Sequence, residues 1–532
     1  MNKSKEYDLV VIGGGINGAA VAWDAALRGL SVCLLEKGDF GSGSSSGCFR
    51  IAHGGLRYLQ HLDLRRMFES VLEQRTLRII APHFVKPLEF MVPCSGSGSK
   101  SKSFLSLGLA VYQALTFWKN FGVAANNKLP LFKMLSKEGL GTELPKLAQQ
   151  NCSGAVTFSD CQIFNCDRLT YSIVHSAKLA GAATLNYHKV VSFNKEADNK
   201  GTGALKSVKV KKVLTGEEIE ISGKFFVNAS GPWVEGVLEL ANSRKRPDVF
   251  SKGVQAVVSG QLSDKAIALE SQHIDSSTLI SRGGRSYFIV PWRGHTLVGT
   301  SDSVFKGDPD DFQVKQEEVE DLLSEVSSLL GEKVSLSGFG GLRPVDFTKL
   351  GANEGDATVS NQDIIEDYKE IDNLISLIGV KYTTFRAFAK KAVDRISSKS
   401  SITSKTKIYG GQFSNLTELE KELAEAKLFS GTTIKRLVSD YGSKARDIVS
   451  LAKADNSLRE ELGGITAAEL AFVCREEQVE QLDDALKRRT PFLSFGKPSQ
   501  EQLARAAELV AREKGWSGEE LDSQINQLVS NA

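Results

Sequence analysis

The chain has 532 residues, 41% of them hydrophobic, and this length predicts two or three domains with large buried cores. Its 66 basic and 64 acidic residues leave a formal net charge of +2, so no global basic field favours nucleic acid as a partner. Seven cysteines without a CxxC pair argue against a disulfide framework or a zinc site, and we expect no metal. A reducing, cytoplasmic compartment fits this composition best.

A glycine fingerprint follows the first predicted strand. Residues 7–12 form a short apolar run that is typical of a buried parallel strand, and Gly13, Gly15 and Gly18 follow at once. In order, these glycines permit a tight turn, a close approach of backbone to a pyrophosphate, and close packing of the next helix on the strand. The pattern therefore predicts a phosphate-binding turn.

The next elements extend this turn into a dinucleotide-binding unit. A helix is predicted over 16–28 and a second strand over 30–35, and Glu36 follows at the spacing of an acid that accepts ribose hydroxyls. The helix N-terminus would present N–H groups and a favourable dipole to the phosphates. The fingerprint alone does not separate nicotinamide from flavin, because both bind through the same turn.

A second loop, over 41–47, alternates glycine and serine and suits phosphate as well. Together with later motifs, it resembles the FAD-dependent glycerol-3-phosphate dehydrogenases, within the D-amino-acid-oxidase-like flavoproteins. The matching runs cover nearly the whole chain and are, in order, 8–18, 53–59, 81–83, 158–161, 167–169, 228–233, 291–292, 299–302, 341–344 and 381–386.

The resemblance implies an α/β FAD-binding Rossmann-like domain with an antiparallel-sheet substrate domain, plus an α-helical C-terminal domain. The oxidoreductase region is expected over 1–400, and the helical domain over 408–532, after a serine- and lysine-rich link. FAD-binding segments are expected at about 1–90, 150–240 and 335–400, and substrate-binding segments at about 91–149 and 241–334. In the helical domain, the pair Arg488-Arg489 is predicted to be a solvated helix end, in preference to a binding role.

The same resemblance implies a reaction and its residues. The reaction is oxidation of sn-glycerol 3-phosphate to dihydroxyacetone phosphate by hydride transfer to FAD, with the electrons passed to a quinone. The cofactor-binding residues are expected to be Gly13, Gly15, Asn17, Gly18, Glu36, Ser44, Ser45, Ser46, Gly231 and Gly341. The substrate-binding residues are Arg57, Tyr58 and Thr384, and the catalytic residues are His53, Arg343 and Lys381.

The chemistry of these side chains suits a phosphorylated alcohol. Arginine binds phosphate through its planar fork and lysine through a compact charge, and which cation holds the phosphate and which steadies the developing alkoxide is left open. His53 is the candidate general base, because histidine titrates near working pH. Cofactor contact or substrate orientation are the alternative roles for His53.

Two places depart from the family pattern. After the serine loop, relatives have small hydroxyl residues and then lysine, whereas this chain has Cys48, Phe49 and Arg50. Before Lys381, relatives have two glycines, whereas here Val380 stands in the second position and is poorly suited to positive φ. Because of these changes, the sequence does not determine the flavin potential, the choice of substrate or the electron acceptor.

A stripe of apolar residues bears on the electron acceptor. It is spaced for one face of a helix, is flanked by Lys100, Lys102 and Lys119, and consists of Phe104, Leu107, Gly108, Val111, Leu115 and Trp118. A helix lying on the inner face of the cytoplasmic membrane and a buried core helix explain it equally well. No apolar run reaches the roughly 20 residues that span a bilayer.

Several readings therefore remain open beside the quinone-linked dehydrogenase. They are a glycerol-3-phosphate oxidase that uses oxygen, a related FAD-dependent amino-acid or hydroxy-acid oxidoreductase, a non-catalytic flavoprotein, and a NAD-binding dehydrogenase. The sequence leaves the quaternary structure open as well, a homodimer included, since no heptad seam is present.

Overall fold

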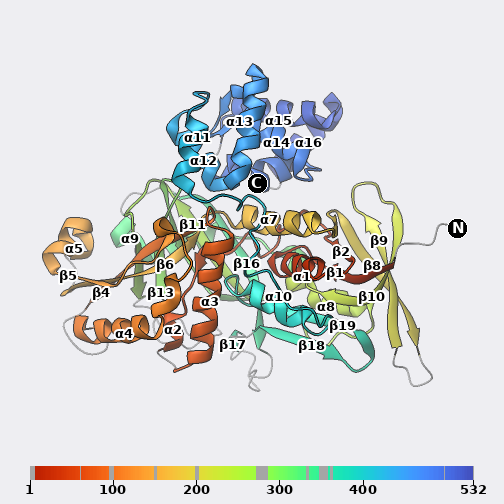
Figure 1. Ribbon diagram of the computed structural model, residues 1–532, viewed down its shortest axis with the longest axis horizontal. Coiled ribbons are helices and arrows are strands. Elements are labelled where there is room, and N and C mark those ends of the chain that lie inside the picture. Colours follow the sequence, from red (N-terminus) through yellow and green to blue (C-terminus); the bar gives the residue numbers. More distant parts are fainter. Residues whose placement is uncertain are drawn as a thin grey trace.

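The computed structural model of the chain holds two large β-sheets and a bundle of helices that lies across the top of the view in Figure 1. The structure describes residues 6–59, 62–94, 101–148, 152–197, 203–270, 286–330, 335–346, 358–359, 363–495 and 498–530.

The first sheet has eight strands and contains the glycine fingerprint at the end of its central strand. β1 (Glu6–Ile12) runs parallel to β10 (Glu218–Asn228) on one side and to β2 (Val32–Leu35) on the other. β19 (Ile371–Ile378) pairs in parallel with β10. The remaining strands are β7 (Ala183–Leu185), β8 (His188–Ala197), β9 (Gly203–Lys212) and β18 (Ile364–Tyr368).

Helices cover both faces of this sheet. Leu9 and Val11 of β1 join the core beneath α1 (Ile16–Leu27), α7 (Cys166–Leu179) and α10 (Phe385–Val393). The alternate residues of β1 point to a second core, which includes Leu238 of α8 (Val234–Leu240). The predicted strands and helix of residues 7–35 are confirmed to within two residues at each end.

The second sheet has eleven strands, and most of its pairings are antiparallel. Its strands are β3 (Ile51–Ala52), β4 (Val85–Cys94), β5 (Lys133–Leu135), β6 (Gly154–Ile163), β11 (Val249–Val258), β12 (Ala266–Glu270), β13 (Ser286–Trp292), β14 (His295–Gly299), β15 (Ser303–Lys306), β16 (Ser335–Asp346) and β17 (Thr358–Val359). The division into cofactor and substrate segments stays a prediction. β6 and β16, which we placed in cofactor segments, are strands of this second sheet.

Six helices accompany the second sheet in the described ranges. They are α2 (Leu56–Leu59), α3 (Leu64–Ile80), α4 (Lys102–Leu115), α5 (Lys137–Glu143), α6 (Pro145–Ala148) and α9 (Gln316–Leu330). Short 3-10 turns cover Phe117–Asn120, Ala125–Asn127, Gly231–Trp233 and Pro309–Asp311.

The C-terminal helices form a domain with its own hydrophobic core, as predicted. Thr466 begins one helix with a full capping box to Glu469, and Gly515 ends another in the left-handed conformation. The helices are α11 (Leu416–Ala424), α12 (Gly431–Tyr441), α13 (Ala445–Ala454), α14 (Ala467–Glu476), α15 (Gln500–Lys514) and α16 (Gly518–Ser530), and the pair β20 (Glu461–Leu462) and β21 (Ile465–Thr466) precedes α14.

The prediction that Arg488 and Arg489 form a solvated helix end is wrong. Both side chains are buried, and both donate to the carboxylate of Asp39, in the loop that follows β2. Arg168 of α7 makes a comparable buried pair with Glu477. Buried charges need partners, and here each domain supplies the partner of the other, so ion pairs join the helical domain to α7 and to the loop that follows β2.

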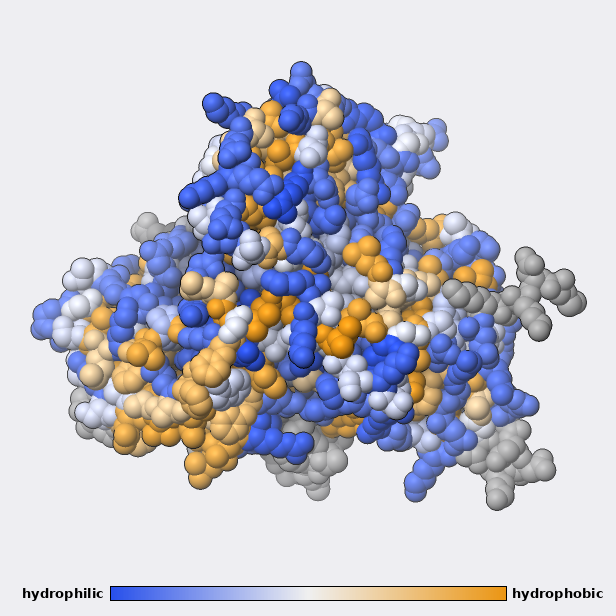
Figure 2. Space-filling view, viewed as in Figure 1, coloured by the Kyte–Doolittle hydropathy of each residue, from blue (hydrophilic) through white to orange (hydrophobic). Residues whose placement is uncertain are grey.

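The first part of the apolar stripe lies on the surface, whereas Leu115 and Trp118 are half-buried and pack against a core cluster. Phe104, Leu107 and Val111 of α4 are 59%, 65% and 44% exposed, and apolar side chains gather at the lower left of Figure 2, where Figure 1 places α4. Of the flanking lysines, Lys119 is buried beside the Tyr112 ring and is not a surface charge, while Lys100 lies outside the described residues. Among the described helices, none has the length and apolar character needed to cross a membrane.

Candidate active site

The turn between β1 and α1 has no room for side chains. Gly13 has a φ of +104°, and a Cβ there would lie 2.6 Å from the carbonyl oxygen of Ala229. A Cβ on Gly18 would lie 1.9 Å from the carbonyl oxygen of Gly13. These contacts exclude any residue larger than glycine, and they bring the N-terminus of α1 to the carboxyl edge of the sheet, where N–H groups and dipole favour an anion.

The serine loop meets this helix end. The backbone N–H of Ile16 donates to Ser45 Oγ at 3.0 Å, and Ser44 Oγ donates to the carbonyl of Leu342 at 2.8 Å. A Cβ on Gly341 would lie 3.2 Å from the Cα of Ser44. The loop therefore lies between α1 of the first sheet and β16 of the second, and it places Ser44, Ser45 and Gly341 together.

Glu36 lies at the carboxyl end of β2, beside the same turn. The N–H groups of Gly14 and Gly38 donate to its two carboxylate oxygens at 2.6 and 2.8 Å. Burial raises the pKa of the Glu36 carboxyl, and the two N–H groups oppose that rise. Each oxygen keeps a lone pair, so the carboxylate can still accept a sugar hydroxyl.

Asn17 and Gly231 complete this edge of the sheet. The Oδ1 atom of Asn17 is buried and has no hydrogen-bond partner among the described residues, and a Cβ on Gly379 would lie 2.2 Å from Asn17 Nδ2. Gly231 has a φ of +61° and follows β10, whose carboxyl end lies beside that of β1. An orphaned buried acceptor, glycines without room for a Cβ and a helix N-terminus together fit a dinucleotide such as FAD.

His53 lies where the serine loop leads into the second sheet. Its Nδ1 is 3.7 Å from Asp160 Oδ2, its side chain is 55% exposed, and its backbone N–H donates to Thr383 Oγ1 at 3.2 Å. Asp160 is fixed in turn, since its Oδ1 accepts from the Gly54 N–H and from Gln74 Nε2. The imidazole therefore has a carboxylate on one side and solvent-accessible space on the other.

Lys381 and Tyr58 lie in contact with each other. Lys381 Nζ stands 4.4 Å from the centre of the Tyr58 ring, on α2. Thr384 is buried and donates to Asp363, which also accepts from the backbone N–H of Val380. Arg57 lies on the same short helix as Tyr58 and is exposed. The structure thus groups His53, Tyr58 and Lys381 through the 381–384 segment.

Arg343 lies on β16, the strand that contacts the serine loop. Its Nη2 donates to Ser251 Oγ at 2.9 Å and lies 3.2 Å from Asp302 Oδ1. Residues 339, 341 and 343 alternate onto one face of β16, and Ser44 lies against that face at Gly341. Arg343 is therefore on the side of the strand that faces the serine loop, with its charge partly offset by Asp302.

Comparison with known proteins agrees with this geometry. The FAD dependent oxidoreductase family matches residues 8–365, and the C-terminal domain of alpha-glycerophosphate oxidase matches residues 401–521. The chain is 30% identical to a glycerol-3-phosphate dehydrogenase of Synechocystis, with 98% of this chain and 95% of the relative covered. It is also 30% identical to the mitochondrial glycerol-3-phosphate dehydrogenase of Mesocricetus auratus, with 97% and 72% covered.

The chain belongs to the FAD-dependent glycerol-3-phosphate dehydrogenase family. The solved structure of a glycerol-3-phosphate dehydrogenase from Bacillus halodurans, complexed with FAD, has the same fold, with a TM-score of 0.75 at 24% identity over 99% of this chain and 94% of that one. The predicted fold class and the predicted cofactor, FAD, are confirmed, and the chain is an FAD-dependent oxidoreductase.

The departures from the family pattern have visible consequences. Phe49 packs against Phe288, with ring centres 6.3 Å apart, and fills the space beside Gly299. Arg50 is buried over the Trp292 ring and lies 3.7 Å from Asp167. Val380 is not among the residues with positive φ in the described chain, so its backbone differs from the glycine conformation we considered.

Sequence reasoning missed the acidic partners of the site. Asp160 holds the His53 segment, Asp302 pairs with Arg343, and Asp363 holds the 380–384 segment. Asp160 and Asp302 stand inside motifs that the family resemblance singled out, at 158–161 and 299–302. Their positions were therefore visible in the sequence, but their contacts depend on tertiary structure.

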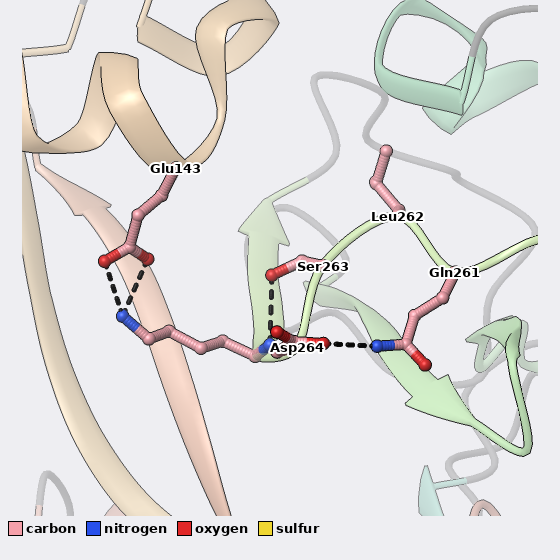
Figure 3. A pocket seen from close by; sticks show the side chains of 6 residues that line it. Glu143, Gln261, Leu262, Ser263 and Asp264 are labelled. Atoms are coloured by element: carbon pink, nitrogen blue, oxygen red, sulfur yellow. Dashed lines mark hydrogen bonds and ion pairs between the residues drawn. The ribbon is translucent and has the colours of Figure 1, made fainter.

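A hollow of about 490 Å³ lies elsewhere on the second sheet, at the loop of residues 261–265 (Figure 3). Lys265 reaches across it to both carboxylate oxygens of Glu143 at 2.6 Å. None of the predicted site residues lines it. We assign it no part in the family's chemistry.

Proposed function

We propose that this flavoenzyme oxidises sn-glycerol 3-phosphate to dihydroxyacetone phosphate and passes the electrons to a quinone. FAD, when bound, accepts the hydride from the central carbon of the substrate. The observation that carries the proposal is the group formed by His53, Tyr58 and Lys381 beside the fingerprint edge, since it combines a carboxylate-supported base with a cation. The similarity of the chain to two glycerol-3-phosphate dehydrogenases supports the same substrate.

His53 is proposed as the general base that takes the proton of the reacting hydroxyl. Asp160 faces Nδ1 at 3.7 Å, so Nε2 is the ring nitrogen left to accept a proton. The ordered contacts of Asp160 with Gly54 and Gln74 keep this carboxylate in place. The alternative, that His53 only orients the substrate, predicts that a His53 variant slows flavin reduction but keeps the pH dependence of its rate.

Lys381 and Arg57 are proposed to bind the phosphate dianion. No ion pair with a described carboxylate is found for Lys381, so its charge remains available, and Arg57 is exposed beside Tyr58. Arg343, which already contacts Asp302 and Ser251, is proposed to steady the developing alkoxide instead. Tyr58 and Thr384 are proposed to complete the substrate contacts.

An anaerobic spectrum tests the substrate and the base together. Glycerol 3-phosphate should bleach the flavin band of the holoenzyme within seconds, whereas D-alanine and D-lactate should leave it unchanged. The His53→Asn variant should keep FAD and bleach at least tenfold more slowly. If an amino acid or a hydroxy acid bleached the flavin and glycerol 3-phosphate did not, the proposed substrate would be wrong. A wild-type rate of flavin reduction in the variant would remove His53 from the mechanism.

The electron acceptor is proposed to be reached at a membrane surface. α4 exposes Phe104, Leu107 and Val111, and the segment after it adds Phe117 and Phe121, which are 69% and 58% exposed. Exposed apolar residues on one face of an amphipathic helix are typical of proteins that lie in the membrane interface, and quinones are dissolved in the apolar layer beneath it. The proposed location is the inner face of the cytoplasmic membrane.

Two measurements test the acceptor. The double variant Phe104→Ser, Leu107→Ser should lose co-sedimentation with anionic lipid vesicles and keep its flavin reduction rate, while Leu179→Ser, at another exposed leucine, should change neither. A soluble ubiquinone analogue should be reduced faster than oxygen. Stoichiometric peroxide would instead support the oxidase alternative, which the match of residues 401–521 also suggests.

A further inference from the structure

Two cysteines meet behind the serine loop. The Sγ atoms of Cys48 and Cys166 lie 2.6 Å apart, although the residues are 118 positions apart in the chain. A disulfide bond measures about 2.04 Å, so the sulfurs need to approach by only about half an ångström to form one.

Both sulfurs are held by ordered structure. Cys166 is the first residue of α7, whose N-terminus is capped by the Asn165 side chain, and Cys166 is fully buried. Cys48 follows Gly47, whose backbone lies so close to Gly340 that a Cβ there would be 1.9 Å from the Gly340 carbonyl oxygen. Cys48 keeps partial exposure. A small reagent can therefore reach the Cys48 thiol, whereas the Cys166 thiol lies buried behind it.

The charges around the pair make the two thiols unequal. Burial alone would raise the pKa of Cys48, but the hydrogen bond from Cys166 and the Arg50 guanidinium outweigh it, so this pKa is lowered. Burial raises the pKa of Cys166, and the neighbouring Cys48 raises it further. A partly exposed thiol with a lowered pKa beside a buried thiol with a raised pKa is the arrangement of an attacking and a resolving cysteine.

We propose that Cys48 and Cys166 form a reversible redox site that hydrogen peroxide or another hydroperoxide oxidises to a disulfide. The Cys48 thiolate attacks one peroxide oxygen, the O–O bond breaks, and hydroxide leaves, which gives a sulfenic acid on Cys48. The Cys166 sulfur then attacks the Cys48 sulfur, the S–O bond breaks, and water leaves with the Cys166 proton. In total, two thiols and one hydrogen peroxide give one disulfide and two waters.

The site lies where oxidation would reach the active site. Cys48 connects the serine loop to His53, and Arg50, two residues on, contacts Asp167 of α7. Tyr382, the residue that follows Lys381, donates a hydrogen bond from its hydroxyl to the carbonyl of Cys166 at 2.9 Å. A covalent bond here joins the serine loop to α7, and we expect it to raise the thermal midpoint of unfolding by a few degrees, because it closes a loop of more than one hundred residues.

Thiol counting and peptide mapping on the FAD-loaded protein test the proposal. After treatment with a few equivalents of hydrogen peroxide, the number of alkylatable thiols in the unfolded protein should fall from seven to five, and dithiothreitol should restore it. Digestion should yield one linked peptide pair that contains Cys48 and Cys166. A mixture of linkages, or no loss of thiols while the flavin stays bound, would overturn the proposal.

Single variants separate the two roles. In Cys166→Ser, a sulfenic acid should accumulate on Cys48 and react with dimedone, whereas in Cys48→Ser no sulfenic acid and no linked pair should form. Cys474→Ser, which removes a partly exposed thiol of the helical domain, is the matched control and should keep the Cys48–Cys166 linkage. Equal peroxide reactivity of Cys166 in Cys48→Ser would contradict the assignment of Cys48 as the attacking thiol.

Discussion

The proposed cofactor side and the proposed substrate side of the candidate site are built in different ways. On the cofactor side, backbone atoms pack with no room for a Cβ, and the loop behind them is held by buried ion pairs from the helical domain. On the substrate side, His53 is 55% exposed and Arg343 is 34% exposed, and each depends on one nearby carboxylate. The first side is therefore tied to the stability of the fold, and the second can change its chemistry at little cost to the fold.

We expect the largest loss of function from a substitution at Gly18, where the turn has the least space for a side chain. Gly18→Ala places a Cβ where only 1.9 Å separates it from the Gly13 carbonyl oxygen, so the turn must move and FAD binding should be lost. The flavin absorbance per protein after gel filtration measures this. Gly236→Ala, at a helical glycine with open space around it, is the matched control and should keep its flavin. A fully flavinated Gly18→Ala protein would contradict the packing argument.

On the substrate side, Lys381→Met should keep FAD and lose substrate affinity. A hydrogen bond to a charged group contributes about 1.5–3 kcal/mol, so kcat/KM for glycerol 3-phosphate should fall about 10- to 100-fold, mainly through KM. Steady-state kinetics with a soluble acceptor measures the change. Arg395→Met, at an exposed cation paired with Asp367, should leave KM unchanged. An unchanged KM in Lys381→Met would remove Lys381 from phosphate binding.

The junction between the domains should be sensitive to loss of Asp39. Asp39→Asn leaves Arg488 and Arg489 without their shared carboxylate, and breaking a buried pair in this way costs about 3–5 kcal/mol of the free energy of unfolding. Calorimetry should show a lower unfolding midpoint. Asp367→Asn, in an exposed pair with Arg395, should cost about 0–1 kcal/mol and shift the midpoint little. Equal shifts of the unfolding midpoint in both variants would show that the buried ion pairs of the junction stabilise the protein no more than an exposed pair does.

The same junction predicts a pH dependence. Burial alone would raise the pKa of Asp39, but Arg489 and Arg488 outweigh it and hold this pKa at about 2. Because this value lies below the unfolded pKa of about 3.9, the stabilisation is complete above about pH 4 and is lost as the pH falls toward 2. The difference in unfolding midpoint between wild type and Asp39→Asn should therefore close below about pH 4. A gap that persisted there would contradict the ion-pair account.

The smallest effect concerns the helical domain itself. Thr466→Ala removes the capping box of α14 and should cost about 1 kcal/mol of stability. The flavin content and the rate of flavin reduction should stay at wild-type values, since α14 lies outside the site. Thermal unfolding of the holoenzyme, followed by circular dichroism, measures the loss. Thr417→Ala, on the surface of α11, is the control and should change the midpoint less.

The strand, helix and strand of residues 7–36 were predicted well because their signals are local. Turn, helix, strand and acid all lie within residues 7–36, and each glycine has a steric reason that the pattern reveals. The ion pairs behind that turn could not be predicted, since Arg488 and Asp39 are 449 positions apart. A pair of arginines near a helix end is usually solvated, and only the fold shows that these two are buried.

The assignment of the substrate-site residues stays a prediction, and their contacts could not be predicted from the sequence. The motif at 53–59 pointed to His53 and Tyr58, whereas the carboxylate of Asp160 and the ring contact of Lys381 arise from the packing of distant segments. The helical stripe shows the same limit. Its spacing was correct, but core and surface helices share that spacing, and the exposure of Phe104 and Leu107 decides between them.

The most direct test is an anaerobic titration of the holoenzyme with glycerol 3-phosphate, with the product measured at each step. The account predicts that one dihydroxyacetone phosphate forms for each FAD bleached, and that adding a quinone analogue restores the flavin band and allows further turnover. A flavin band that persists at excess glycerol 3-phosphate, or bleaching without dihydroxyacetone phosphate, would contradict it.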